Sequence, residues 1–214
     1  MIISHSKKFI FIHIQKTAGT SVTRYLNNYL NYQDMIVGGT KYGEKIQPLI
    51  KERFKMHKHS NAQSIKTITG DELWNSYFTF SFVRNPWDRM VSLYNWCCKG
   101  KYDFPICQEA MGATDFSQFI RGKCFKQVPQ QIDYLTNNKD EVIVDFIGKQ
   151  ESIQEDFDYV CKRLEVPNAD MLKFKHNVRN RSLSSYHDYY SSEEDIEIIK
   201  KQFASDISFF NYKF

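Results

Sequence analysis

Apolar runs alternate with amphipathic segments along the chain, and this alternation predicts strands and helices in turn. Residues 9–14 form a nearly continuous apolar run, which is typical of a strand buried on both faces. Residues 78–83 form a second such run, and residues 141–147 are expected to form a third strand. Strands separated by helical segments indicate an α/β fold with a central parallel sheet flanked by helices.

Helical periodicity marks the segments that follow these strands. After the first strand, apolar residues recur on one helix face, at Val22, Tyr25, Leu26, Tyr29 and Leu30. Helices are expected at residues 20–32, 62–77 with a break near Gly70, 86–98, 152–164 and 191–203. Asn85 can cap the third of these and Pro86 can occupy its first turn, while the Ser-Ser-Glu-Glu run at 191–194 is typical of a helix start.

The pattern weakens at residues 99–130 and 173–190, and long stretches of this kind are often functional. The chain has no internal repeat and no linker rich in Pro, Gly or Ser. A single domain spanning residues 1–214 is therefore expected.

Composition and charge narrow the functional class. The net charge of +4 comes from basic residues that are spread along the chain, which argues against nucleic-acid binding and fits a small anionic ligand. Five cysteines without a CxxC spacing suggest neither a disulfide framework nor a zinc site. No apolar run approaches the roughly 20 residues of a transmembrane helix, and residues 1–11 are too short and polar for a signal peptide, so a cytoplasmic enzyme is expected.

Residues 15–21 have the chemistry of a phosphate-binding turn between a strand and a helix. Such a turn presents backbone N–H groups at a helix N-terminus, where the helix dipole favours an anion. Gly19 permits close approach, Lys16 supplies a positive charge, and hydroxyl groups come from Thr17, Thr20 and Ser21. The segment is not a Walker A motif, because Lys16 precedes the glycine by three residues.

A second strand-to-helix junction repeats this chemistry. Arg84 follows the strand at 78–83 and can bind a phosphate with its forked guanidinium, although an ion pair with Asp88 would explain it structurally. Ser92 lies two turns into the following helix and can point back toward the same edge.

The two junctions together resemble the carbohydrate sulfotransferases, the group that contains the heparan sulfate 2-O- and 6-O-enzymes and their bacterial relatives. Residues 12–21 (IHIQKTAGTS) resemble the 5′-phosphosulfate loop of that family, and residues 82–92 (FVRNPWDRMVS) resemble its 3′-phosphate motif. Weaker similarity continues at residues 145–157 and 206–214. The resemblance covers nearly the whole chain, apart from residues 26–56 and 99–129.

This resemblance implies a P-loop NTPase-like fold and a reaction that uses 3′-phosphoadenosine 5′-phosphosulfate (PAPS) and releases PAP. Lys16 and the loop Thr17-Ala18-Gly19-Thr20-Ser21 would hold the 5′-phosphosulfate, and Arg84 with Ser92 would hold the 3′-phosphate. Candidates for a C-terminal clamp on the nucleotide are Lys175, Arg179, Arg181 and Tyr186. A bacterial cytoplasmic enzyme that needs no metal is expected, with a carbohydrate or glycoconjugate acceptor.

Sulfuryl transfer needs a stabilised leaving group and a base for the acceptor hydroxyl. Lys16 suits the first task. For the second, bacterial relatives similarly place a His shortly before an Ala and a Gly-Glu-Leu segment, here His59, Ala62 and residues 70–73 (GDEL). This resemblance makes His59 the expected base, with His57 in reserve. Asp71 and Glu72 are carboxylate alternatives, although helix capping explains Asp71. His13 lies within the first strand and is expected to be structural.

Two other functions remain open at this point. A P-loop-like phosphotransferase would share the fold but needs Walker A spacing and a magnesium carboxylate after a strand, and Asp145 falls within the expected third strand. A non-catalytic nucleotide- or glycan-binding protein would keep the binding motifs without turnover. The side chains expected to suit sugar binding are Tyr42, Tyr102, Phe104, Arg121 and Lys123.

Overall fold

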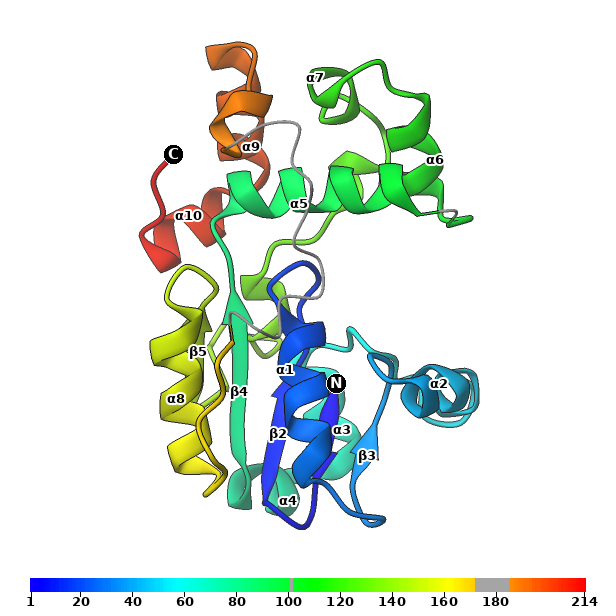
Figure 1. Ribbon diagram of the computed structural model, residues 1–214, viewed down its shortest axis with the longest axis vertical. Helices are drawn as coiled ribbons and strands as arrows, with labels where there is room; N and C mark the ends of the chain where they lie inside the picture. The colour runs from blue at the N-terminus through cyan, green and yellow to red at the C-terminus, as the bar shows by residue number, and fades with distance from the viewer. Residues whose placement is uncertain (101, 172–184) are drawn as a thin grey trace. The chain divides into compact units, whose positions relative to one another are not determined.

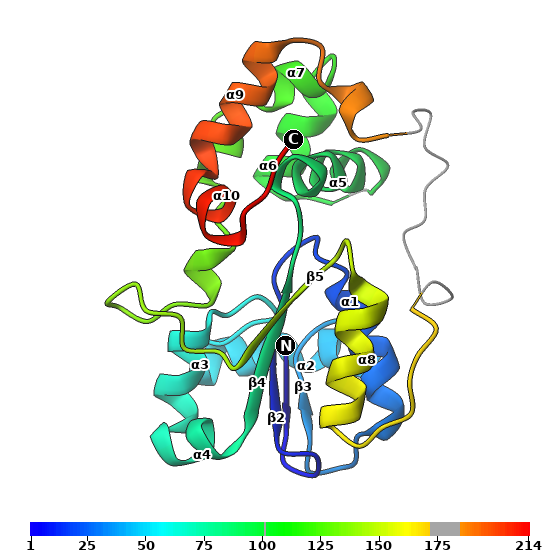
Figure 2. The same cartoon turned by 90° about the vertical axis from the view of Figure 1, so that its left-hand side faces the viewer.

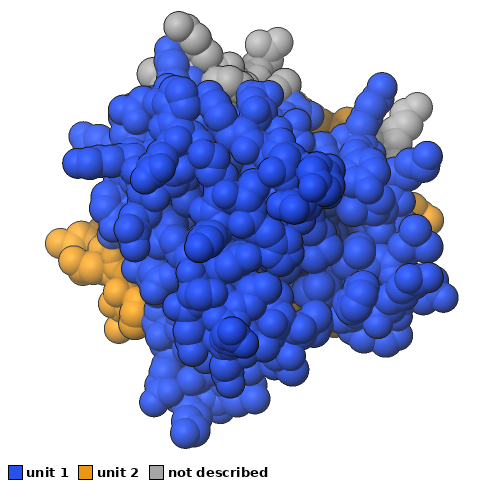
Figure 3. All heavy atoms as spheres, turned by 90° about the horizontal axis from the view of Figure 1, so that it is seen from below, with its two compact units in different colours: residues 1–83, 133–178 blue, residues 84–132, 179–214 orange. Residues whose placement is uncertain are grey.

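The computed structural model describes residues 1–100, 102–171 and 185–214, which form two compact units. Unit 1 comprises residues 1–83 and 133–178, and unit 2 comprises residues 84–132 and 179–214 (Figure 3). The expectation of one domain over the whole chain stays a prediction. The candidate clamp residues Lys175, Arg179 and Arg181 lie outside the described residues.

Unit 1 is built on a sheet whose strands have the order β3-β1-β2-β4-β5 (Figure 1). The strands are β1 (Ile2–Ser4), β2 (Phe9–Ile12), β3 (Met35–Ile36), β4 (Phe78–Val83) and β5 (Phe146–Lys149). The predicted parallel centre is confirmed in β2, β4 and β5, with Ile12 opposite Ser81 and Val83 opposite Lys149. The sheet as a whole is mixed, because β1 pairs antiparallel with both β2 and β3.

Helices cover both faces of this sheet. The helices of unit 1 are α1 (Gly19–Leu26), α2 (Lys41–Phe54), α3 (Ala62–Thr69), α4 (Asp71–Ser76) and α8 (Ile153–Arg163). α1 and α8 lie on one face and α3 and α4 on the other (Figure 2). On the first face, Phe11 and Phe82 of the strands share a buried cluster with Val22 of α1 and Phe157 of α8. Burial of such apolar side chains is the main force that holds these layers together.

Unit 2 is helical in its described part. Its helices are α5 (Pro86–Lys99), α6 (Pro105–Gly112), α7 (Phe116–Phe119), α9 (Glu193–Gln202) and α10 (Ala204–Phe210). The predicted start of α5 is confirmed, because the Asn85 side chain accepts a hydrogen bond from Trp87 N at 3.0 Å and Pro86 occupies the first turn. The Ser192 side chain caps α9.

Short 3₁₀ helices occur in both units, at Asn27–Tyr29, Phe125–Gln127, Ile132–Tyr134 and His187–Tyr189.

Candidate active site

The loop between β2 and α1 has an uncommon backbone conformation. Lys16 and Ala18 adopt φ angles of 68° and 67°, in the left-handed region that costs an L-residue about 1–2 kcal/mol each. Strain of this kind concentrates at ligand sites, and turns that alternate between left- and right-handed residues can form anion-binding concavities. Helical hydrogen bonding begins directly afterwards, with Ser21 N donating to Ala18 O at 2.9 Å. Gly19, Thr20 and Ser21 therefore form the first turn of α1, as a phosphate cradle requires.

Gly19 brings this loop against a buried histidine. A Cβ atom at Gly19 would lie 2.2 Å from Cδ2 and 2.4 Å from Nε2 of His13, so no larger residue fits without displacing the imidazole. The His13 ring is buried and stacks on Phe11, with 5.6 Å between ring centroids. Burial holds the pKa of His13 well below its usual value, so its ring is neutral. The expected structural role of His13 thus includes support for the loop.

Thr17 has a different place from the one expected of a hydroxyl donor to phosphate. Its buried hydroxyl donates to the carbonyl oxygen of Ile14 at 3.0 Å, within the same loop. This bond closes the turn that follows β2, and β2 itself ends at Ile12, two residues before the end of the apolar run. The other two hydroxyl groups expected to bind phosphate, those of Thr20 and Ser21, lie in the first turn of α1.

His59 is held beside His13 in unit 1. Its Nδ1 lies 2.7 Å from the carbonyl oxygen of His13, and the two imidazole rings meet edge to face at 4.9 Å. Because a carbonyl oxygen only accepts, Nδ1 carries the proton and Nε2 of the neutral ring has the lone pair. Burial lowers the pKa of His59 to about 3, and the nearby Lys58 and N-terminal amine add to this shift. The geometry gives His59 the tautomer that a general base needs.

His57, the reserve candidate, takes part in a local turn. Its Nδ1 accepts a hydrogen bond from the backbone N–H of His59 at 3.1 Å, and its own N–H donates to the Ser60 hydroxyl at 2.8 Å. Burial lowers the pKa of His57 as well. These bonds hold the turn that carries His59.

In unit 2, Arg84 forms the ion pair with Asp88 that the sequence offered as its structural explanation. Arg84 Nε and Nη2 donate to Asp88 Oδ2 at 2.9 and 2.6 Å, and both side chains are largely buried. Ser92 is buried in α5, one turn after Asp88 and therefore on the same helix face. Asp88 and Ser92 thus share one face of α5, and Arg84, which precedes the helix, pairs with Asp88.

Gln131 fixes the backbone of Arg84 and was not identified from the sequence. Its side-chain oxygen accepts from Arg84 N and its amide nitrogen donates to Arg84 O, both at 2.8 Å. Asp206 accepts hydrogen bonds from the backbone N–H groups of Gln131 and Ile132, each at 2.8 Å. Burial raises the pKa of Asp206 above its usual value despite these bonds. A lone Gln in a segment of weak periodicity gives no sequence signal for such a role.

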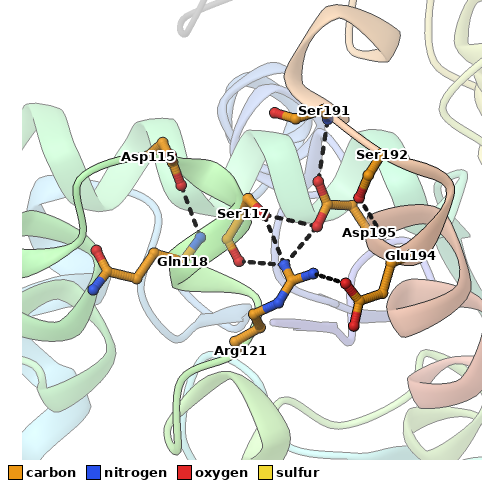
Figure 4. Close-up of polar contacts among 8 residues, drawn as sticks. All are labelled: Asp115, Ser117, Gln118, Arg121, Ser191, Ser192, Glu194 and Asp195. Atoms are coloured by element: carbon orange, nitrogen blue, oxygen red, sulfur yellow. Dashed lines mark hydrogen bonds and ion pairs between the residues drawn. The ribbon is translucent and has the colours of Figure 1, made fainter.

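Arg121, proposed above as a sugar-binding cation, is engaged inside unit 2 (Figure 4). Its guanidinium donates to Asp195 Oδ1 at 2.5 Å and to Glu194 Oε2 at 2.9 Å. This network ties α7 to α9. The clamp candidate Tyr186 stacks on His187 with 3.9 Å between ring centroids.

Among residues 1–100, 102–171 and 185–214, no group of three or more His, Cys, Asp or Glu side chains could hold a metal ion. Within the same ranges, no helix has the length and apolar character needed to cross a membrane.

Comparison with known proteins identifies the family. An uncharacterized protein of Archaeoglobus fulgidus is 33% identical over 109 residues, which cover 50% of this chain and 82% of that protein. The crystal structure of mouse sulfotransferase SULT7A1 complexed with PAP shares the fold, with a TM-score of 0.57 at 13% identity over 95% of this chain and 86% of that chain. This likeness confirms the predicted P-loop NTPase-like architecture. Because a model of the Sulfotransferase family matches residues 1–213, the chain belongs to that family.

Proposed function

We propose that the protein transfers a sulfuryl group from PAPS to a hydroxyl group of a carbohydrate acceptor and releases PAP. The observation that carries this proposal is the left-handed loop at Lys16 and Ala18, closed against His13 by Gly19, in a chain of the Sulfotransferase family. A Cβ at Gly19 would collide with the His13 imidazole, so glycine is what lets the loop close on His13 in this conformation. Lys16 and the first N–H groups of α1 would bind the 5′-phosphosulfate.

Arg84 and Ser92 would bind the 3′-phosphate. Arg84 is preorganised for this by two constraints, because Gln131 holds its backbone and Asp88 holds its guanidinium. To bind, the Arg84 guanidinium would donate to the phosphate either together with Asp88 or in place of it. Charge-assisted hydrogen bonds to a phosphate are strong enough to compete with those to a carboxylate. The hydroxyl of Ser92, on the same helix face, would add a neutral donor.

His59 would act as the general base. As the acceptor oxygen bonds to sulfur and the bond from sulfur to the phosphate oxygen breaks, Nε2 of His59 takes the hydroxyl proton and Lys16 stabilises the departing phosphate. The pKa of about 3 belongs to the protein without ligand. A bound phosphosulfate would raise the pKa of His59 toward its usual value, because a nearby negative charge favours the imidazolium.

A phosphotransferase fits these residues less well. Asp145, the carboxylate that could have held magnesium, lies one residue before β5, at the amino end of the strand. Its Oδ2 accepts from Thr79 N at 2.8 Å and from the Thr79 hydroxyl at 2.9 Å, so it joins the starts of two neighbouring strands. Ligands of open α/β sheets bind at the opposite, carboxyl ends of the strands.

The test is a PAPS-dependent transfer assay with a panel of saccharides, together with calorimetry of PAP binding. Lys16→Ala and Arg84→Ala are expected to abolish transfer and weaken PAP binding, whereas His59→Ala should lower turnover and leave PAP binding intact. Tight binding of ATP, with PAP excluded, would favour a phosphotransferase. PAP binding without transfer to any acceptor would favour a non-catalytic binding protein, and wild-type turnover of His59→Ala would remove the base assignment.

A further inference from the structure

Three aromatic side chains in unit 2 form an exposed shelf that the proposed chemistry does not use. Trp96 lies near the end of α5, and Tyr102 and Phe104 lie just before α6. The ring centroids of Trp96 and Tyr102 are 4.2 Å apart with planes 22° from parallel. Phe104 is 6.3 Å from Trp96 and 6.2 Å from Tyr102, again within 26° of parallel. We call these three rings the aromatic shelf.

Phe104 widens the aromatic shelf instead of covering it. Because Phe104 is almost equidistant from two stacked rings, it must lie beside the pair and not on top of it. Tyr102 and Phe104 keep 38% and 55% of their surface exposed. Core rings of the same unit meet differently, for example Phe119 and Phe125 at 71°. Near-parallel exposed rings present a flat apolar surface, whereas edge-to-face core contacts do not.

Gly100 allows the aromatic shelf to form. A Cβ atom at Gly100 would lie 1.8 Å from Cε2 and 2.2 Å from Cδ2 of Tyr102. The Tyr102 ring therefore lies directly against the Gly100 backbone, and any larger residue would push it off Trp96. Gly100 itself has an ordinary φ of −97°, so space and not backbone conformation demands glycine here.

A polar pair accompanies the apolar rings. Gln108 Nε2 donates to Asp103 Oδ1 at 2.6 Å, and both residues are exposed. Asp103 lies between Tyr102 and Phe104 in the chain. Carboxylate and amide groups beside a flat apolar surface match a ligand with one apolar face and a rim of hydroxyl groups, because each kind of surface then meets its complement.

We propose that the aromatic shelf binds a pyranose ring of a saccharide, with the C–H face of the sugar on Tyr102 and Phe104 and its hydroxyls toward Asp103 and Gln108. This proposal deepens the proposed function, on which it rests for the use of the bound sugar as acceptor. Stacking supplies apolar contact area and the polar pair selects hydroxyl-bearing ligands over purely apolar ones. The shelf would thus contribute to acceptor recognition separately from the phosphate loop.

The test measures binding directly and does not depend on turnover. Full-length protein is applied to a glycan array, and the saccharides retained are measured by calorimetry. Phe104→Ala and Tyr102→Ala are expected to weaken binding at least tenfold. Gly100→Ala, which keeps all three rings but displaces Tyr102, should have a similar effect. Matched controls are Gly112→Ala, whose Cβ would meet open space, and Tyr32→Ala, 93% exposed in unit 1; both should bind as wild type does.

Each outcome decides between the alternatives. Retention of no glycan, or equal binding by Gly100→Ala and wild type, would overturn the assignment of the aromatic shelf. Binding of p-nitrophenol without binding of any saccharide would show that the aromatic shelf takes a planar phenol and not a sugar, and would also overturn the assignment. PAP binding, measured on the same variants, should stay at the wild-type level. If the wild-type protein did not bind PAP, the proposed function would be wrong. Glycan binding by the aromatic shelf would then remain a separate result.

Discussion

At the scale of the residue, Gly19 sets how closely the phosphate loop approaches its support. We predict that Gly19→Ala lowers PAP affinity at least tenfold, about 1.4 kcal/mol, because the new methyl group would displace either the His13 imidazole or the first turn of α1. Calorimetry with PAP measures the loss. Gly112→Ala is the matched control, since a Cβ there has no neighbour within 4 Å. Unchanged PAP affinity in Gly19→Ala would show that the contact between Gly19 and His13 does not affect ligand binding.

The buried histidines give the stability of the protein a defined pH dependence. The pKa of His59 is about 3 in the folded protein and near 6.5 when unfolded, and that of His13 is also lowered. Between these values the unfolded chain binds more protons than the folded chain. The stability that these two histidines contribute therefore falls as the pH drops below about 6.5 and is constant above that pH.

We predict that His59→Gln makes this acid destabilisation shallower, because glutamine does not titrate. Thermal unfolding of the wild type and the variant at pH 7.5, 6.5 and 5.5 measures the difference. His13 keeps its own contribution in both proteins, so part of the decline should remain. An equal or steeper decline in His59→Gln would show that burial of His59 does not depress its pKa in this way.

At the scale of the element, Asp195 joins α9 to α7 through a buried carboxylate. Burial alone would raise the pKa of Asp195, but hydrogen bonds from Arg121 and Ser117 outweigh it and the pKa lies below its usual value. We predict that Asp195→Ala costs about 2–3 kcal/mol of stability, because it leaves the Arg121 guanidinium without its buried partner. Urea unfolding measures the change.

Glu194→Ala is the matched control for this prediction, since Glu194 binds the same guanidinium from the surface. Its side chain is 75% exposed, and exposed ion pairs contribute about 0–1 kcal/mol. If the two substitutions lowered the free energy of unfolding equally, burial of Asp195 would add no stability to the network in Figure 4.

Two buried thiols connect α5 with α6. The Sγ atoms of Cys97 and Cys107 lie 2.8 Å apart, and a small further approach reaches the disulfide length of about 2.05 Å. We predict that diamide closes this bond: the two thiols lose two protons and two electrons, and the N=N bond of diamide takes up both. Peptide mapping without reductant should find the crosslink. Cys161→Ser should leave it intact, whereas detection of other pairs instead would contradict the geometry.

Elements could be predicted from the sequence where an apolar pattern reports burial. The limits of β4 are those predicted, and the break between α3 and α4 falls at Gly70 as expected. α2 was missed although Ile46, Leu49 and Ile50 recur at helical spacing, and Pro48 within it is a residue that argues against a helix interior. The strand expected at 141–147 instead begins at Phe146, because the residues before it pair with the segment just upstream: Ile143 N donates to Leu135 O at 3.0 Å, and Thr136 and Val142 form an antiparallel bridge.

The candidate site divides in the same way. The turn between β2 and α1 could be predicted because a strand, a Lys, a Gly and a helix follow one another within a few residues. The partners that set its chemistry come from distant parts of the chain: His59 meets His13 across 46 positions, and Gln131 meets Arg84 across 47. Such contacts depend on tertiary packing, which local pattern does not report.

At the scale of the whole molecule, the two motifs proposed to bind phosphate belong to different compact units, since Lys16 is in unit 1 and Arg84 in unit 2. Under the proposed function, one nucleotide contacts both motifs through its 5′ and 3′ phosphates. We predict that PAP slows amide hydrogen exchange in residues 13–22 and also in residues 84–95, because a bound ligand stabilises every segment it contacts. Mass spectrometry of peptides from these segments measures the effect.

The variants make this prediction specific to the two motifs. Lys16→Ala and Arg84→Ala should each remove the protection from both segments, since either substitution weakens the same bound ligand. Peptides of α2 in unit 1 and of α6 in unit 2 serve as internal references and should exchange at the same rate with and without PAP. Protection confined to residues 13–22 would mean that Arg84 and Ser92 do not bind the 3′-phosphate. The cofactor would then be held by unit 1 alone, and the Arg84 ion pair with Asp88 would be purely structural.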